Sequence, residues 1–329
     1  MSSQRFVSRR RKLVSVLALA ATVTNLGRNR EIPARQIAYY AERARDGVGL
    51  VITEGLAVHP SSIPNETVPL AFDRELVPEF ARLATAVHAH GRTLLGQLWH
   101  AGRQALWNPM QLPWSASSER DPYSGSTPHA MTDAEVVELV DAFAASAQNL
   151  QAAGFDGVEL HGAHGYLLTQ FMSPWSNRRD DRWGGPVENR ARLVAEITRA
   201  IRARCGDGFV VGLKLSVDEG VPGGLDLEAS QALVAHLVDV ARPDYLGISQ
   251  GNFSPSLEWH VPDLTFRPAH FRQLYRGIRD VADGVPVMGL GKIESVALAD
   301  ELVASGECDL AAFARALLPD PRLVEKARR

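Results

Sequence analysis

Short apolar runs alternate with longer amphipathic stretches along the whole chain. The apolar runs predict strands at residues 13–21, 49–53, 93–98, 157–160, 209–216, 245–249, 285–290 and 309–313. The amphipathic stretches predict helices at residues 33–45, 75–90, 187–204, 227–241, 268–281 and 296–304. A further helix begins after Thr132, which forms a capping box with Glu135, and a last one follows Pro319.

Eight strand-then-helix units are typical of a (β/α)8 TIM barrel, an α/β fold. An open, doubly wound sheet is the alternative arrangement of the same units. No repeat or linker divides the sequence, so we expect one domain over residues 1–329. Residues 107–129, rich in Pro and Ser, follow the third strand, and we expect this insertion to cap a site.

The N-terminal segment has two interpretations. A basic run, Arg9-Arg10-Arg11-Lys12, precedes an apolar stretch at residues 13–23, as in a signal peptide. The same stretch can also form the first buried strand, and we favour the strand because the barrel needs one here. The stretch is too short to span a membrane.

Composition excludes several other classes of protein. The chain has 329 residues, of which 45% are hydrophobic and 22% charged, and these values are ordinary for a globular protein with a large core. A net charge of -3 gives no reason to expect nucleic-acid binding. The two cysteines, Cys205 and Cys308, have no metal-site or disulfide spacing. We therefore expect a cytoplasmic protein, without a membrane or nucleic-acid partner.

Polar residues and glycines gather where the predicted strands end, and in a TIM barrel these ends form the active-site face. They are Glu54, Gly55, Gln97, His100, Arg103, His161, His164, Tyr166, Lys214, Gln250, Gly251, Asn252, Gly291, Lys292, Ala314 and Arg315. The last four follow strands seven and eight. Glycine backbone and two cations there are typical of a phosphate cradle.

The residues alone leave the chemistry open. His161 and His164 have a spacing found in metal sites, but no third ligand is well placed. The alternatives are that both are structural residues or that they are paired donors to a substrate oxygen. Tyr166 is a proton donor or a packed aromatic. Lys214 is a Schiff-base lysine, a contact for an electron-rich ring or a phosphate, or a solvated strand end. The charged run at residues 178–182 predicts ion pairs that brace a loop.

The segment HGAHGYLLTQFMSPWSNRRDDRWGGPVENR, residues 161–190, resembles the signature of the old yellow enzyme family of FMN-dependent oxidoreductases. The closest similarity is to the 2,4-dienoyl-CoA reductase and trimethylamine dehydrogenase group. Further matching segments follow in order at residues 38–55, 96–103, 286–293 and 313–327. The resemblance covers nearly the whole chain.

This resemblance implies a barrel that binds FMN at its mouth and takes electrons from NADH or NADPH. Gly55 and Gln97 are implied to contact the flavin ring. The implied phosphate ligands are Gly291, Lys292, Ala314 and Arg315. The implied catalytic residues are His161 and His164, which bind a substrate carbonyl oxygen, and Tyr166, which donates a proton. The implied activity is an ene-reductase that passes hydride to the activated C=C bond of an α,β-unsaturated carbonyl or thioester.

Three features depart from the family pattern. Lys214 stands where an arginine is usual; it keeps the positive charge beside the flavin but loses the planar fork. The loop after the first strand, residues 20–25, is altered, and Ala21 and Thr22 are the expected flavin contacts there. The four-cysteine cluster of the dienoyl-CoA reductase group is missing from this sequence. We therefore expect no iron–sulfur cluster from Cys205 and Cys308. Either the chain is a stand-alone barrel or it is part of a longer parent protein.

Other functions compete with the ene-reductase. One is an amine dehydrogenase or demethylase of the trimethylamine dehydrogenase type. Another is a flavin-binding scaffold that has lost turnover, and a third is a lyase that uses Lys214 as a Schiff base. For the ene-reductase, the expected partner is a small enone or enoyl thioester. A homo-oligomer is compatible with the sequence.

Overall fold

Eight parallel strands close into a barrel in the computed structural model, which describes residues 16–105, 112–253 and 255–328. The strands are β1 (Leu17–Leu19), β2 (Leu50–Ala57), β3 (Thr93–Trp99), β6 (Gly157–Gly162), β7 (Val210–Ser216), β8 (Tyr245–Ser249), β9 (Val287–Gly289) and β10 (Leu310–Phe313). Each strand pairs with the next in this order, and β10 pairs with β1, which closes the sheet. The predicted barrel is confirmed, and the open sheet is excluded.

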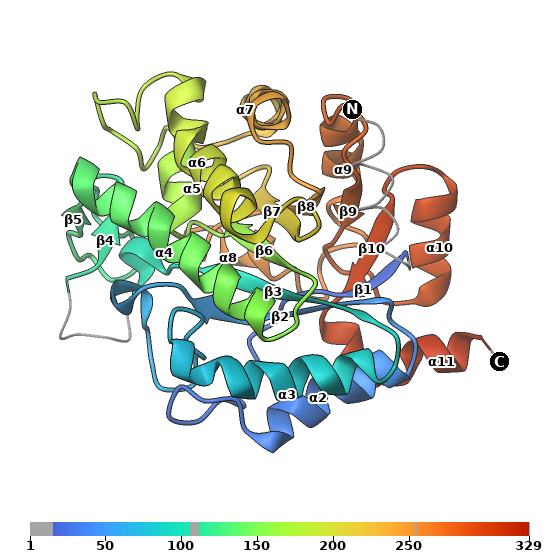
Figure 1. The fold of residues 1–329 in the computed structure, drawn as a ribbon. Coiled ribbons are helices and arrows are strands. Elements are labelled where there is room, and N and C mark those ends of the chain that lie inside the picture. The colour runs from blue at the N-terminus through green and yellow to red at the C-terminus, as the bar shows by residue number, and fades with distance from the viewer. Residues whose placement is uncertain (1–15, 106–111, 254, 329) are drawn as a thin grey trace.

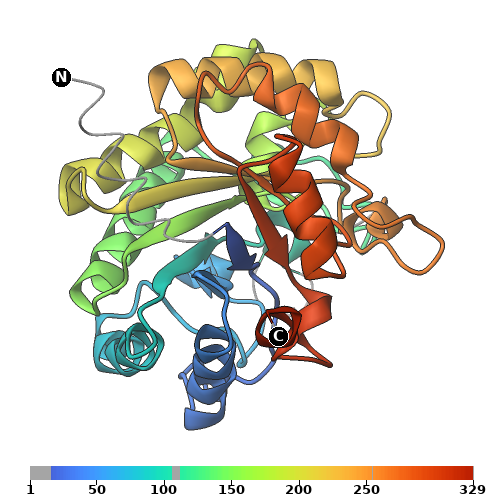
Figure 2. The same cartoon turned by 90° about the vertical axis from the view of Figure 1, so that its right-hand side faces the viewer.

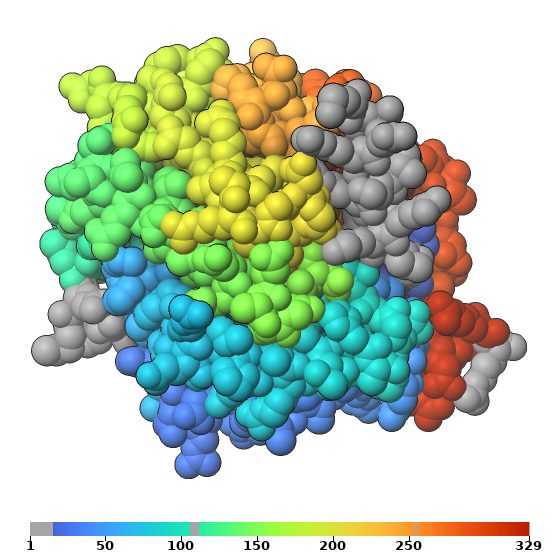
Figure 3. Space-filling view, in the orientation of Figure 1, coloured from blue at the N-terminus to red at the C-terminus, as the bar shows by residue number. Residues whose placement is uncertain are grey.

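Helices surround the barrel on the outside (Figures 1 and 2). The main ones are α2 (Ala34–Arg45), α3 (Val77–His88), α4 (Asp133–Ala152), α6 (Val187–Cys205), α7 (Leu227–Val240), α9 (Arg272–Arg279) and α10 (Val296–Ala304). The shorter ones are α5 (Leu167–Met172), α8 (Leu257–His260) and α11 (Leu323–Ala327). Successive segments cover one face of the molecule in chain order, from blue below to orange above (Figure 3).

Several strand boundaries differ from the sequence prediction. The first strand was predicted over residues 13–21, but among the described residues it is only Leu17–Leu19. The basic run at residues 9–12 lies outside the described part of the chain. Strands β2, β3 and β6 continue past their predicted ends, to Ala57, Trp99 and Gly162. Gly55 and His161, which were predicted to follow their strands, pair in the ladder with Gln97 and Lys214, which were predicted inside theirs.

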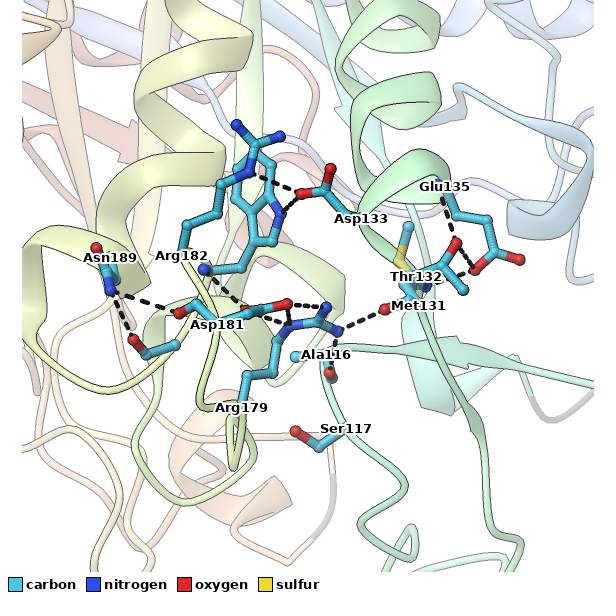
Figure 4. Close-up of polar contacts among 12 residues, drawn as sticks. Ala116, Ser117, Met131, Thr132, Asp133, Glu135, Arg179, Asp181, Arg182 and Asn189 are labelled. Carbon is cyan, nitrogen blue, oxygen red and sulfur yellow. Dashed lines mark hydrogen bonds and ion pairs between the residues drawn. The ribbon is translucent and has the colours of Figure 1, made fainter.

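The insertion after β3 carries a small parallel pair, β4 (Trp114–Ser115) and β5 (His129–Ala130). The charged loop after α5 forms the predicted ion pairs, Arg179–Asp181 and Arg182–Asp133, and also contacts the residues that follow β4 and β5 (Figure 4). Arg179 forms an ion pair with Asp181 at 2.5 Å and donates to the carbonyl oxygens of Ala116 at 2.8 Å and Met131 at 2.6 Å. Arg179 thus ties the loop after α5 to Ala116 and Met131, the residues that follow β4 and β5.

Side chains fill the inside of the barrel, as the closed fold requires. The ring of Tyr245 on β8 occupies the space beside Gly212 on β7, where a Cβ would collide with the ring.

Cys205 and Cys308 are free thiols, and burial raises the pKa of each to about 11. Within the described residues, no helix has the length and apolar character needed to cross a membrane. Over the same residues, no group of three or more His, Cys, Asp or Glu side chains is arranged to hold a metal ion.

Candidate active site

A cavity of about 880 Å³ opens at the carboxyl ends of the barrel strands. All twelve residues for which the sequence predicted a catalytic or cofactor-binding role line it: Ala21, Thr22, Gly55, Gln97, His161, His164, Tyr166, Lys214, Gly291, Lys292, Ala314 and Arg315. They come from the barrel strands or the loops that follow them. The barrel therefore brings together residues that are almost 300 positions apart in sequence.

The loop after β6 holds one catalytic candidate, His164, in an unusual backbone conformation. His164 and Gly165 both have positive φ angles, 63° and 73°. The side-chain amide of Gln104 donates to both of their carbonyl oxygens, at 3.1 and 2.7 Å. A Cβ at Gly165 would meet Asn252 Oδ1 and, at 2.6 Å, Gln104 Nε2. Glycine at 165 is therefore required both by the backbone angle and by the close approach of the amides.

Three rings converge on one wall of the cavity. The rings of His161 and His164 lie edge to face with centroids 5.0 Å apart. Tyr166 is 4.9 Å from His161 and 6.4 Å from His164, again edge to face. The ring of Trp99 also meets that of Tyr166 edge to face, at 5.2 Å, and helps to hold it in place.

Both histidines are neutral at physiological pH. Burial lowers the pKa of His161 and of His164 well below the usual value, and the charge of Lys214 adds to the effect on each. The backbone N–H of Ala163 is 3.3 Å from Nδ1 of His161 and donates to it, so the proton of the neutral ring is on Nε2. His164 Nε2 is 2.7 Å from the hydroxyl oxygen of Ser249. When Ser249 donates, the proton of His164 is on Nδ1.

Tyr166 keeps its proton over the same pH range. Burial raises the pKa of its hydroxyl group to about 12. The cavity wall therefore carries two neutral imidazoles and one protonated phenol.

A buried polar network forms the floor of the cavity. Gln97 Nε2 donates to Glu159 Oε1 at 2.7 Å, and the hydroxyl of Tyr245 donates to Glu159 Oε2 at 2.7 Å. Burial lowers the pKa of Lys214, and the charge of Glu159 opposes this effect. Gln97 and Lys214 line the cavity, and Glu159 lies beneath them.

The altered loop after β1 is fixed by Glu54, a buried carboxylate that also lines the cavity. It accepts from the hydroxyl of Thr24 at 2.5 Å, from the backbone N–H of Thr24 at 3.2 Å and from the amide of Gln36. Burial raises the pKa of Glu54, and these hydrogen bonds oppose the rise. The loop with Ala21 and Thr22 is thereby tied to β2 and α2.

Two cations, Lys292 and Arg315, line the cavity next to Gly291 and Ala314 in sequence. Lys292 Nζ donates to the carbonyl oxygen of Phe266 at 2.5 Å, and Arg315 Nη2 donates to that of Pro262. Gly291 has a φ of 87°, and a Cβ there would collide with the ring of Phe271. Backbone N–H groups beside a glycine and two cations form the donor set that a phosphate prefers.

The cavity fits FMN in size and in the kinds of groups that line it. Its volume is within the range of small-molecule sites. Apolar and glycine surface from Ala21 and Gly55 offers a place for a flat ring, and Gln97 and Lys214 offer polar partners for the ring's edge. The Lys292 and Arg315 cations are suited to its phosphate.

The structure adds residues that the sequence did not single out. His260 on α8 lines the cavity and stacks on His164, and burial lowers its pKa to about 3. Ser249 and Phe253 line the cavity as well. Helix α8 is only four residues long and has no hydrophobic periodicity, so no pattern placed His260. Its position in the connection that follows the sixth strand was the one available signal.

Some predicted mouth residues lie outside the cavity wall. His100 and Arg103 are buried behind it, with His100 Nε2 2.9 Å from Ser61 Oγ and Arg103 over the ring of Trp175. Of the insertion after β3, the described residues 112–130 contribute no side chain to the wall. Tyr123 contacts the wall through an edge-to-face pair with Phe253, at 6.1 Å. These residues support the cavity wall rather than form it.

Comparison with known proteins places the chain in a family. It is 34% identical to N,N-dimethylglycine/sarcosine dehydrogenase of Chromohalobacter salexigens over 96% of this chain and 46% of that protein. It is also 34% identical to NADH oxidase of Thermoanaerobacter brockii over 95% of this chain and 48% of that protein. The chain thus spans about half the length of these two curated relatives.

A solved structure has the same fold as this chain. The complex of 2-naphthoyl-CoA reductase with 2-naphthoyl-CoA matches with a TM-score of 0.88 and 27% identity, over 95% of this chain and 50% of that one. The model of one family, described as NADH:flavin oxidoreductase / NADH oxidase, matches residues 16–329. The resemblance inferred from the sequence is confirmed: the chain belongs to this family, the old yellow enzyme family of flavin oxidoreductases.

Proposed function

We propose that the protein is an FMN-dependent ene-reductase that uses NADH or NADPH to reduce the activated C=C bond of an α,β-unsaturated carbonyl or thioester. Bound FMN would supply the hydride transfer between nicotinamide and substrate. The observation that carries the proposal is the wall formed by His161, His164 and Tyr166, which combines neutral N–H donors with a protonated phenol.

The two imidazoles would bind the carbonyl oxygen of the substrate. His161 presents its Nε2–H, because its Nδ1 accepts from the backbone of Ala163. Ser249 can fix the tautomer of His164 that carries its proton on Nδ1. Negative charge grows on the carbonyl oxygen as the β-carbon gains hydride, and fixed donors stabilise that charge most in the transition state.

Tyr166 would protonate the α-carbon. A phenol with a pKa of about 12 stays protonated at neutral pH and becomes a useful acid only toward a strongly basic carbon. Packing against Trp99 and His161 holds the ring in place. The fixed ring supports donation from one side of the bound substrate.

The remaining lining residues would hold the cofactor. Ala21, Thr22, Gly55, Gln97 and Lys214 would contact the ring, and Gly291, Lys292, Ala314 and Arg315 would bind the phosphate. Lys214 supplies a point charge instead of a planar fork, so we expect one directed contact from it where arginine makes two.

A second candidate is an amine dehydrogenase or demethylase, which the similarity to N,N-dimethylglycine/sarcosine dehydrogenase favours. Trp99 and Tyr166 could offer ring faces to a cationic amine, and Glu54 a negative charge. In that case substrate oxidation would reduce the flavin, and NAD(P)H would not be needed.

Two further functions are compatible with the site. A scaffold without turnover would bind FMN but reduce no enone. A Lys214 lyase would be trapped by borohydride with a carbonyl substrate, and burial, which lowers the pKa of Lys214, favours that nucleophile. A cytoplasmic location and a homo-oligomer also stay predictions.

Anaerobic single-turnover spectroscopy separates the candidates. The FMN-loaded protein is reduced with NADH or NADPH and mixed with cyclohexenone or an enoyl thioester, and reoxidation of the flavin is followed. In a second arm the oxidised protein is mixed with N,N-dimethylglycine. We expect reoxidation by an enone or thioester and no bleaching by the amine; the reverse result would establish the amine dehydrogenase.

A further inference from the structure

Glu159 is a fully buried carboxylate directly beneath the cavity floor, with 1% of its surface exposed. It lies on β6, two residues before His161, and is paired in register with Gln97 on β3. Both carboxylate oxygens accept hydrogen bonds at 2.7 Å, one from the amide of Gln97 and one from the hydroxyl of Tyr245. Of these two partners, Gln97 is the one that lines the cavity.

Burying a carboxylate at this position costs free energy, because a charge loses its contact with water. Burial raises the pKa of Glu159, and the charge of Lys214 and the two hydrogen bonds act in the opposite direction. An apolar side chain would fill the same volume without desolvating a charge. The inside of the barrel therefore carries a carboxylate that packing alone does not require.

The hydrogen-bond inventory shows what the carboxylate does to its neighbour. Both oxygens of Glu159 accept in this structure, one of them from the NH2 group of Gln97. When Glu159 is ionised it has no proton to donate, so only this orientation of the Gln97 amide forms the hydrogen bond. The carbonyl oxygen Oε1 of Gln97 is then turned away from Glu159 and can accept from a ligand in the cavity. A neutral amide at 159 would accept either orientation of the Gln97 side chain.

We propose that Glu159 is a positioning residue that fixes the amide of Gln97 so that its oxygen accepts from an N–H group of the bound ligand. This inference rests on the proposed function, because the imide N–H of the FMN ring is the donor that such an acceptor would take. Glu159 itself does not line the cavity and acts through Gln97.

A double-mutant cycle on FMN affinity tests this role. The dissociation constant of FMN for the apoprotein is measured by flavin fluorescence for the wild type, Glu159→Gln, Gln97→Leu and the double variant. We expect Glu159→Gln to weaken binding about tenfold, the value of one directed hydrogen bond to a buried partner. In the Gln97→Leu background the same change should have no further effect. Equal weakening in both backgrounds would overturn the proposal.

Glu307→Gln is the matched control. Glu307 is also buried, with 4% of its surface exposed, and pairs with Arg272 just before β10, at the amino end of the strands and away from the cavity. Its replacement should lower thermal stability and leave the FMN dissociation constant unchanged. A carboxylate that only supports the barrel would behave like Glu307.

A change in the ligand tests the same role of Gln97 and Glu159 without a substitution at Glu159. 3-Methyl-FMN lacks the imide N–H, and we expect the wild type to bind it about tenfold more weakly than FMN. Gln97→Leu should bind the two ligands equally. If the wild type binds FMN but does not distinguish it from 3-methyl-FMN, the role of Glu159 is refuted and the proposed function stands. If the wild type binds neither, both fail.

Discussion

The imidazole of His164 stacks on that of His260, with ring centroids 3.6 Å apart and planes 22° apart. The first lies on the loop after β6 and the second on α8, so the stack joins two loops of the barrel mouth. Burial lowers the pKa of both rings, and each ring's charge would repel the other. The stack is compatible with two neutral rings and would be opened by their protonation.

Acid should therefore destabilise the folded protein. Burial lowers the pKa of His100 and His260 to about 3, whereas the unfolded chain titrates near 6.5. Between these values only the unfolded state takes up protons, so stability falls as the pH falls. Lowering the pH from 6.5 to 5 should cost about 2 kcal/mol for each of these two histidines. Urea unfolding at both pH values measures the loss.

His100→Gln provides the control for this prediction. The variant should lose less free energy of unfolding than the wild type over the same pH interval, by about 2 kcal/mol. A wild-type stability that stays constant from pH 6.5 to 5 would show that the buried imidazoles are protonated in the folded state.

Tyr166→Phe should slow reoxidation of the reduced flavin by an enone by about 100-fold or more, because the proton donor is lost while the ring packing against Trp99 is kept. Reduction by NADH or NADPH should be unchanged. Stopped-flow measurement of the two half-reactions separates the effects. An equal loss in both would mean that Tyr166 supports the site instead of donating a proton.

Gly165→Ala should destabilise the protein by about 1–3 kcal/mol and displace the neighbouring histidine. The added methyl group would meet Gln104 and Asn252 at a φ of 73°. Gly185→Ala is the control, since φ is 82° but nothing lies within 4 Å. Thermal unfolding of both variants compares them. Equal losses would assign the whole effect to the backbone angle.

The two cations that line the cavity, Lys292 and Arg315, should distinguish FMN from riboflavin, which has the same ring but no phosphate. We expect Lys292→Met and Arg315→Met each to weaken FMN binding by about 10- to 100-fold, as for a charge-assisted hydrogen bond. Riboflavin binding should not change in either variant. Fluorescence titration measures both ligands, and a parallel loss of riboflavin affinity would place the phosphate elsewhere.

The sequence was informative where a local pattern determines the structure. Alternating apolar runs predicted the barrel, and polar residues at the strand ends predicted which side chains meet, because parallel strands end at one face. Family similarity assigned roles to His161 and Tyr166 that residue type alone left open. These roles remain predictions, while the position of both residues in the cavity is observed.

The sequence was less informative where tertiary contacts decide. The strand position of Glu159 gave no sign of its partners, since Gln97 and Tyr245 come from other strands. His260 lies on a four-residue helix that has no periodic pattern. The capping role predicted for the insertion depended on how its loop packs, and residues 112–130 add nothing to the cavity wall.

The decisive measurement for a flavin-dependent function is the visible spectrum of the purified protein, before and after NADH or NADPH is added without oxygen. We expect flavin absorption with one FMN per chain, in a barrel with Lys214 and the altered β1 loop intact, and bleaching by a nicotinamide donor. A yellow protein that does not bleach would point to another electron donor, such as an amine. A protein that stays colourless after FMN is added would show that the cavity does not hold FMN, and the proposed function would be wrong.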